Sequence, residues 1–69
     1  MMQNRVRELR QRSGMTQAVL GESLGVSRQT INSIEAARYL PSLPLALRMA
    51  RLFGVGVHDI FELEQGDEA

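Results

Sequence analysis

One short stretch of the chain concentrates side chains that can hydrogen-bond to the edges of nucleic-acid bases. Its outward positions are Ser27, Arg28, Gln29, Thr30, Asn32 and Ser33. Arginine pairs with guanine and glutamine with adenine through two hydrogen bonds each, while serine, threonine and asparagine serve phosphates or base edges. A helix that merely faces solvent more often carries Glu and Lys at i, i+4 spacing, which is absent here. We therefore interpret the stretch as a surface that reads double-stranded DNA.

The stretch lies on the second of two short helices that the sequence predicts next to each other. Thr16 and Ser27 are suitable N-cap residues, and the helices that they open run to about Leu24 and about Ala36. Between them Gly25 permits a left-handed backbone, so the second helix can turn sharply against the first. This is a helix-turn-helix arrangement, in which the beginning of the second helix enters the major groove.

Three further helices are predicted around one core, over residues 4–13, 43–53 and 57–63. The first ends at Gly14, and Ser42 and Gly54 bound the second. The inward stripe of the helix over 43–53 is Leu43, Ala46, Met49, Ala50 and Phe53. We expect an all-α, compact fold of five helices as a single domain over residues 1–64, followed by an acidic, disordered tail over residues 65–69.

The net charge of zero hides a basic body and an acidic end. Up to Val57 the chain has eight arginines against three acids, a net charge of +5. From His58 onward it has five acids and no base, a net charge of −5. Such asymmetry favours a polyanion as the partner of the basic part, although an ordinary solvated surface remains an alternative on charge alone.

Several classes of function lack the residues that they need. The chain has no cysteine and a single histidine, so neither a disulfide framework nor a metal site is expected. No nucleophile–base pair, paired carboxylates or glycine-rich phosphate loop is present, so we expect no enzyme and no cofactor. No apolar run reaches the roughly 18 residues of a membrane span, and no signal-peptide pattern opens the chain, so we expect a cytoplasmic protein with no membrane partner.

Taken together, these features resemble the Cro/cI-type helix-turn-helix regulators of the xenobiotic-response-element class. The matching segments are Arg5–Arg10, Met15–Leu20, Leu24–Glu35, Pro41–Leu43, Ala46–Ala50, Phe53–Val55 and Asp59–Phe61. The resemblance covers residues 4–63 and is most specific over residues 26–35. It implies a lambda-repressor-like fold in the small, stand-alone subset of that family.

The resemblance also implies roles for individual residues. The base-reading positions are Arg28, Gln29, Asn32 and Ser33, and the phosphate-contacting positions are Arg10, Gln17, Ser27, Thr30 and Arg38. Arg10 and Glu35 match a pair that often forms an ion pair between the first and third helices. Such a pair would also neutralise the single acid of the reading helix, which would otherwise repel DNA.

The chain departs from the family pattern at residues 36–37, at Gly21 and at Gly56, which stands where serine is common. Ala36 and Ala37 stand where Asn-Gly is common, so either the helix continues or Ala37 adopts a strained left-handed backbone. Gly21 replaces the more usual alanine, which is expected to weaken its helix by about 1 kcal/mol.

The expected function is that of a sequence-specific transcriptional regulator, in particular a repressor. One reading helix covers too few base pairs to find a site in a genome, so we expect a homodimer on a pseudo-palindromic operator. The expected dimer interface contains Leu40, Val57, Phe61 and Leu63. The alternative is a protein-binding module, such as the antitoxin of a toxin–antitoxin pair, with a protein as its partner.

Overall fold

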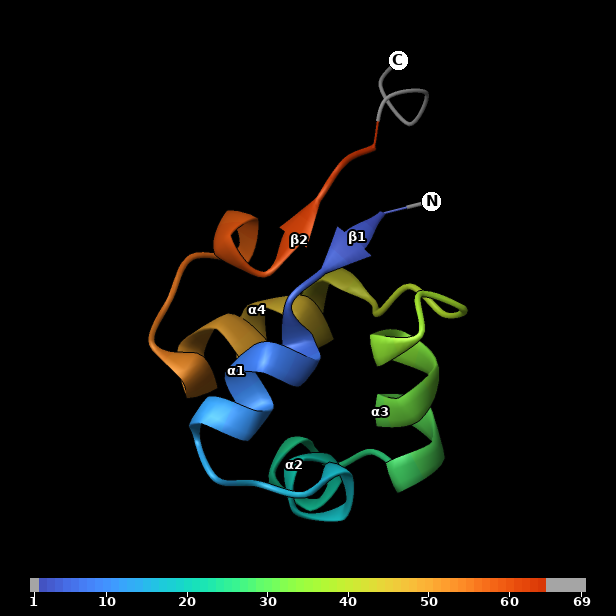
Figure 1. Ribbon diagram of the computed structural model, residues 1–69, viewed down its shortest axis with the longest axis vertical. Coiled ribbons are helices and arrows are strands. Elements are labelled where there is room, and N and C mark those ends of the chain that lie inside the picture. Colours follow the sequence, from blue (N-terminus) through green and yellow to red (C-terminus); the bar gives the residue numbers. More distant parts are fainter. Residues whose placement is uncertain (1, 65–69) are drawn as a thin grey trace.

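The computed structural model describes residues 2–64, and this part of the chain forms four α-helices and a short two-stranded sheet (Figure 1). The helices are α1 (Val6–Arg12), α2 (Gln17–Leu24), α3 (Arg28–Glu35) and α4 (Leu43–Phe53). The strands are β1 (Gln3–Asn4) and β2 (Phe61–Glu62), and a 3-10 turn (Val57–Asp59) precedes β2. Within residues 2–64, no helix is both long and apolar enough to cross a membrane.

The predicted caps form as the sequence indicates. Thr16, Ser27 and Ser42 each accept a hydrogen bond from the backbone N–H three residues later, at 3.1–3.2 Å. Gly25 and Gly54 end α2 and α4 with φ of +74° and +71°. These side chains and glycines satisfy backbone groups that a helix leaves unpaired at its ends. They thereby fix the bounds of the helix-turn-helix, α2 and α3, close to the predicted ones.

The core draws on every helix and on the segment after the 3-10 turn. Its buried residues are Val6, Leu20, Leu24, Ile31, Ile34, Leu45, Ala46, Met49, Ala50, Ile60 and Phe61. Two members of the predicted inward stripe are not among them: Phe53 is half-buried and packs against the core, whereas Leu43 is 68% exposed. Leu43 is the first residue of α4, where Leu45 occupies the inward position instead.

The prediction of an all-α, five-helix fold was wrong at the two ends of the domain. Beyond the 3-10 turn the chain becomes extended, and β2 pairs with β1 in an antiparallel register that sets Phe61 opposite Asn4. The backbone of Ile60 also accepts a hydrogen bond from the Arg5 N–H at 2.8 Å. Ile60 still has a right-handed helical backbone and Phe61 begins the strand, and both side chains are in the core, where 1% and 9% of their surfaces remain exposed. The acidic tail predicted over residues 65–69 lies outside the described residues.

Asn4 explains why α1 begins two residues later than predicted. Its Oδ1 accepts the Val6 backbone N–H at 3.2 Å, and its Nδ2 donates to the carbonyl of Ile34 at 2.8 Å. Local hydrogen bonds of this kind compete with helix formation. Asn4 therefore ends the strand, and it connects β1 to the last turn of α3.

Gly21 has a packing role, as its small size at this position in the sequence predicts. Its carbonyl accepts the Val26 backbone N–H at 2.9 Å, so α2 lies directly against the turn before α3. A Cβ at this position would lie 2.7 Å from the carbonyl oxygen of Val26. The turn would have to shift to accept alanine, so glycine here allows the close contact between α2 and α3.

The end of α3 follows the second of the two predicted alternatives, a left-handed backbone at Ala37. Ala37 has a φ of +59°, in the left-handed region that non-glycine residues avoid. Its N–H donates to Ile34 at 2.9 Å, and the N–H of Arg38 donates to Ser33 at 2.9 Å. These two bonds form a Schellman motif, which pairs carbonyls at the end of the helix. The helix therefore stops at the same place as it would with glycine, at a cost in backbone strain.

We expect the substitution Ala37→Gly to raise the free energy of unfolding by about 0.5–1 kcal/mol. Glycine removes the strain of the left-handed backbone, and its greater entropy in the unfolded chain offsets part of that gain. Urea denaturation of the two proteins measures the difference. Ala36→Gly is the matched control, because Ala36 has a φ of −81° and glycine there should destabilise the protein. A lower stability for Ala37→Gly would contradict the assignment of strain.

Candidate nucleic-acid interface

The two faces of α3 differ sharply in what they contact. Ile31 and Ile34 are completely buried and hold the helix on the core. On the opposite side Arg28 and Gln29 are exposed in the first turn, and within residues 2–64 neither side chain has a hydrogen-bond or ion-pair partner. Their donors and acceptors are therefore available to a ligand.

The other predicted contacts on α3 flank these two residues. Asn32 and Ser33 lie one turn further along the helix, and both are half-buried. Ser27 and Thr30 hold each other through their hydroxyl groups, at 2.9 Å, at the beginning of the helix. Arg28, Gln29, Asn32 and Ser33 thus share the side of α3 away from the core, and Ser27 and Thr30 lie at its beginning.

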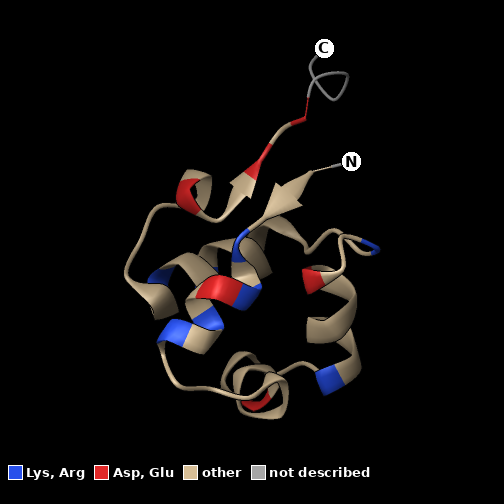
Figure 2. Cartoon of the chain, viewed as in Figure 1, with Lys and Arg blue, Asp and Glu red and all other residues tan. Residues whose placement is uncertain are grey.

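Arg38 lies apart from that group, exposed in the loop that follows α3. Figure 2 shows one basic segment at the start of α3 and another in this loop. The acidic segments of the 3-10 turn and of β2 lie at the opposite end of the molecule from the start of α3 (Figure 2). The acidic end of the sequence is therefore also distant in space from the basic start of α3.

Glu35 is the centre of a buried polar cluster that joins α1, α2 and α3. Its side chain is 0% exposed. It accepts hydrogen bonds from Arg10 Nε at 2.6 Å, from Arg10 Nη2 at 3.2 Å and from Gln17 Nε2 at 3.1 Å. Arg7 Nε is a further donor, at 3.2 Å. The structure thus forms the expected pair of Arg10 and Glu35 and adds two partners to it.

The cluster changes the acidity of both members of the pair. Burial raises the pKa of the Glu35 carboxyl group, but hydrogen bonds from its partners, above all Arg10, together with the Arg10 charge, outweigh it. The net result is a pKa below the usual value. The hydrogen bond to Glu35 raises the pKa of Arg10, although burial acts against it. Both groups are therefore held in their charged forms.

Arg10 is placed in the interior of this cluster, not on the surface where a phosphate contact was expected. Its Nη1 donates to the carbonyl of Met15 at 3.0 Å, so all three guanidinium nitrogens are hydrogen-bonded. Only 12% of its side chain is exposed. Gln17 is another expected phosphate contact. One N–H of its side-chain amide donates to Glu35, and the second N–H is not used in that bond. Sequence reasoning missed the partnership of Arg7, although Arg7 and Arg10 are three residues apart and share a face of α1.

The residues expected at a dimer interface fall into two groups. Leu40 and Leu63 are exposed, at 55% and 53%, and Val57 is half-buried. Phe61 is a core residue, because pairing of β2 with β1 turns it inward. The exposed apolar side chains around the start of α4 include two that were not anticipated at an interface, Leu43 at 68% and Leu47 at 50%.

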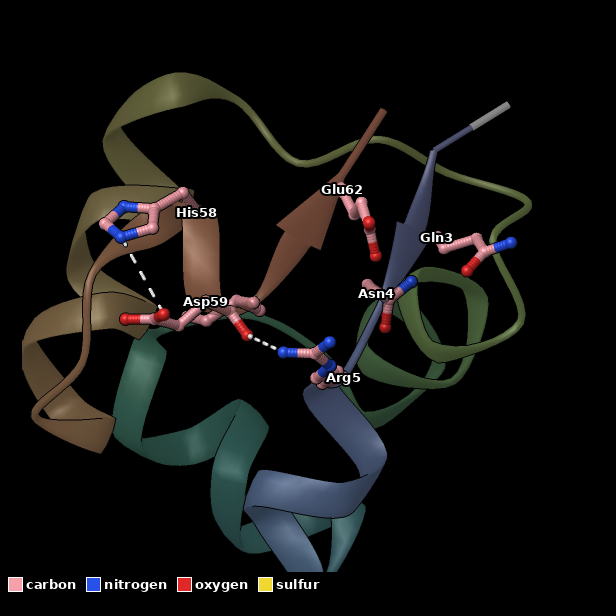
Figure 3. A pocket seen from close by; sticks show the side chains of 7 residues that line it. Gln3, Asn4, Arg5, His58, Asp59 and Glu62 are labelled. Atoms are coloured by element: carbon pink, nitrogen blue, oxygen red, sulfur yellow. Dashed lines mark hydrogen bonds and ion pairs between the residues drawn. The ribbon is translucent and has the colours of Figure 1, made fainter. Parts of the chain in front are cut away.

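A small polar hollow lies beside the sheet, and its lining includes none of these exposed apolar side chains (Figure 3). It has a volume of about 90 Å³ and is lined by Gln3, Asn4, Arg5, His58, Asp59, Ile60 and Glu62. Arg5 Nη1 donates to the carbonyl of Asp59 at 3.4 Å, and His58 Nε2 lies 3.7 Å from Asp59 Oδ1. In the part of the chain that the structure describes, no three His, Asp or Glu side chains are grouped as metal ligands.

Acid should weaken the fold through Glu35. The carboxyl pKa is lowered in the folded state, so below its usual value of 4.5 the unfolded chain binds the proton more readily than the folded chain. The stabilisation is complete above that value and is lost as the pH falls through the folded-state pKa. We expect Glu35→Gln to cost about 3 kcal/mol at pH 7, because it leaves Arg10 buried without its counter-charge. Urea denaturation between about pH 3 and pH 7, which covers the titration of carboxyl groups, measures both the loss of stability in acid and the cost of Glu35→Gln.

Glu8→Gln is the matched control for that measurement. Glu8 pairs with Arg12 at 3.0 Å, but 56% and 72% of the two side chains are exposed. Exposed pairs contribute little to stability, so this variant should behave as the unmodified protein does. Equal losses in the two variants at pH 7 would contradict the special position of Glu35.

Comparison with known proteins matches this architecture over nearly the whole chain. The sequence profile of the helix-turn-helix domain family matches residues 4–63. The uncharacterized HTH-type transcriptional regulator YgzD of Bacillus subtilis is 48% identical over 64 residues, which are 93% of this chain and 97% of that protein. The uncharacterized HTH-type transcriptional regulator MJ0272 of Methanocaldococcus jannaschii is 46% identical over 66 residues, which are 96% of this chain and all of that protein.

A solved structure supports the same assignment. The restriction-modification controller protein C.AhdI of Aeromonas hydrophila superposes with a TM-score of 0.71 and 27% identity, covering 80% of each chain. The profile match covers more than half of the sequence, and the relatives are matched over nearly their full length. This chain therefore belongs to the helix-turn-helix family of DNA-binding transcriptional regulators.

Proposed function

We propose that the protein is a sequence-specific transcriptional repressor that reads its operator with the first two turns of α3. The observation that carries this proposal is the state of Arg28 and Gln29. Both side chains are exposed and lack partners within residues 2–64, on a helix whose other face is fully buried. A rigid helix with unpaired bidentate groups at its beginning suits direct readout in the major groove.

The neighbouring groups would divide between bases and phosphates. Asn32 and Ser33 follow Arg28 and Gln29 by one turn and can reach base edges. The hydroxyl groups of Ser27 and Thr30, and the exposed guanidinium of Arg38, suit contacts with the backbone that fix the register of the helix. Bound across a promoter, the protein would exclude the polymerase from the same DNA.

A second copy of the chain would supply the second half of the operator. One helix reads only about four to six base pairs, which is too little for a genome, whereas a two-fold dimer doubles the site. The surface that we propose for the dimer is the α4 patch, defined as Tyr39, Leu40, Leu43 and Leu47. Each of these side chains is at least 49% exposed, and Leu43 and Leu47 lie one turn apart on α4. Burial against a second copy would remove this apolar surface from water.

Selection of bound sequences from random duplex DNA tests the reading surface. We expect a palindromic motif for the unmodified protein and its loss in the double variant Arg28→Ala, Gln29→Ala, because each lost bidentate contact is worth about 1–3 kcal/mol of base discrimination. Arg51→Ala removes a charge from the last turn of α4 and should leave the motif intact. Weak binding without a motif, fading as salt rises, would contradict sequence-specific regulation.

Sedimentation equilibrium tests the α4 patch. We expect a dimer for the unmodified protein and a monomer for the double variant Leu43→Ser, Leu47→Ser, since serine removes apolar surface from an interface but not from the core. Val19→Ser is the control, because Val19 is also exposed, at 47%, but lies on α2. A dimer that persists in the double variant would place the interface elsewhere. A monomeric chain that binds no DNA would favour the protein-binding alternative.

A further inference from the structure

Arg7 is the one exposed member of the cluster around Glu35. Its side chain is 60% exposed, against 12% for Arg10 and 0% for Glu35. Of its three guanidinium nitrogens only Nε is hydrogen-bonded within residues 2–64, and it donates to Glu35 Oε1 at 3.2 Å. Within residues 2–64, its two terminal nitrogens have no hydrogen-bond partner, so four N–H groups remain available. The bond through Nε limits the positions that this guanidinium can take.

Glu35 holds the guanidinium of Arg7 near Gln17, at the beginning of α2. Gln17 Nε2 and Arg7 Nε donate to the same oxygen, Glu35 Oε1, at 3.1 and 3.2 Å. The two side chains must therefore lie next to each other. Gln17 is the first residue of α2, where the backbone N–H groups have no acceptor within the helix. Two side-chain donors and a helix N-terminus thus lie close together.

The charges around Arg7 favour an anion. The carboxylates that line the same groove as Arg7 are those of Glu8 and Glu35, and each already has an arginine partner, Arg12 at 3.0 Å and Arg10 at 2.6 Å. The group formed by Arg7, Arg10 and Glu35 has a net charge of +1, and the charge that reaches solvent is that of Arg7. Beside it is an open groove of about 350 Å³, lined by Asn4, Arg5, Arg7, Glu8, Gln11 and Glu35.

We propose that the guanidinium of Arg7, and not that of Arg10, contacts a phosphate of the bound duplex beside Gln17. This assignment rests on the DNA-binding function proposed above. Arg10 serves as the buried partner that keeps Glu35 charged. Glu35 in turn holds Arg7 through Nε and leaves its outer edge, with paired N–H groups that match the geometry of a phosphate, directed away from the cluster.

The salt dependence of DNA binding tests this assignment. The affinity for the selected operator duplex is measured against salt concentration for the unmodified protein, Arg7→Gln, Arg7→Lys and Arg51→Gln. For Arg7→Gln we expect the slope of log K against log salt to become less negative by about 0.9 for each bound subunit. The loss of affinity should be equal for the operator and for duplexes with one altered base pair. Arg7→Lys should keep the slope, and so should Arg51→Gln, which removes a charge elsewhere.

An unchanged slope for Arg7→Gln would overturn the assignment while leaving the proposed function in place. If the sequence preference changed at that unchanged slope, Arg7 would act only by positioning Glu35 and α3. Failure of the unmodified protein to select any duplex would instead overturn the proposed function, and this assignment with it.

Discussion

The arrangement of the first three helices depends on one buried carboxylate. Glu35 is the last residue of α3, and its partners come from α1 and α2, so a single side chain joins α3 to both neighbours. Removing a charge from water is costly unless hydrogen bonds and an opposite charge replace the solvent. Here both are present, in a chain small enough that it buries only about 60% of its unfolded surface. The cluster favours one relative orientation of the helices, because other orientations would leave the charge unpaired.

The contacts that hold α3 in place come from its two ends and from its apolar side. The backbone of α3 is satisfied at its beginning by Ser27 and at its end by the Schellman motif of Ala37 and Arg38. Its apolar side is filled by Ile31 and Ile34. Side chains on the other side are therefore not needed to hold the helix. Arg28 and Gln29 can therefore be replaced with little effect on the fold.

Local sequence signals predicted most of the helix-turn-helix, because caps and glycines act over three or four residues. The bounds of α2 and α3 and the pairing of Arg10 with Glu35 follow from such signals and from the family resemblance. The ends of the domain could not be predicted in this way. Asn4 and Phe61 are far apart in the sequence, and their pairing in the sheet replaces the expected fifth helix. Close approach at Gly21 could be predicted, because a small residue in the first helix of the motif leaves room for the turn before the second.

The carbonyl oxygen of Ile34 accepts two hydrogen bonds, from Asn4 Nδ2 at 2.8 Å and from the Ala37 N–H at 2.9 Å. Asn4 belongs to β1, which pairs with β2 near the other end of the domain. A single atom thus connects the sheet in which both ends of the described chain pair to the last turn of α3. A shift of that sheet would have to move this carbonyl, and with it the end of α3, or break one of its two hydrogen bonds.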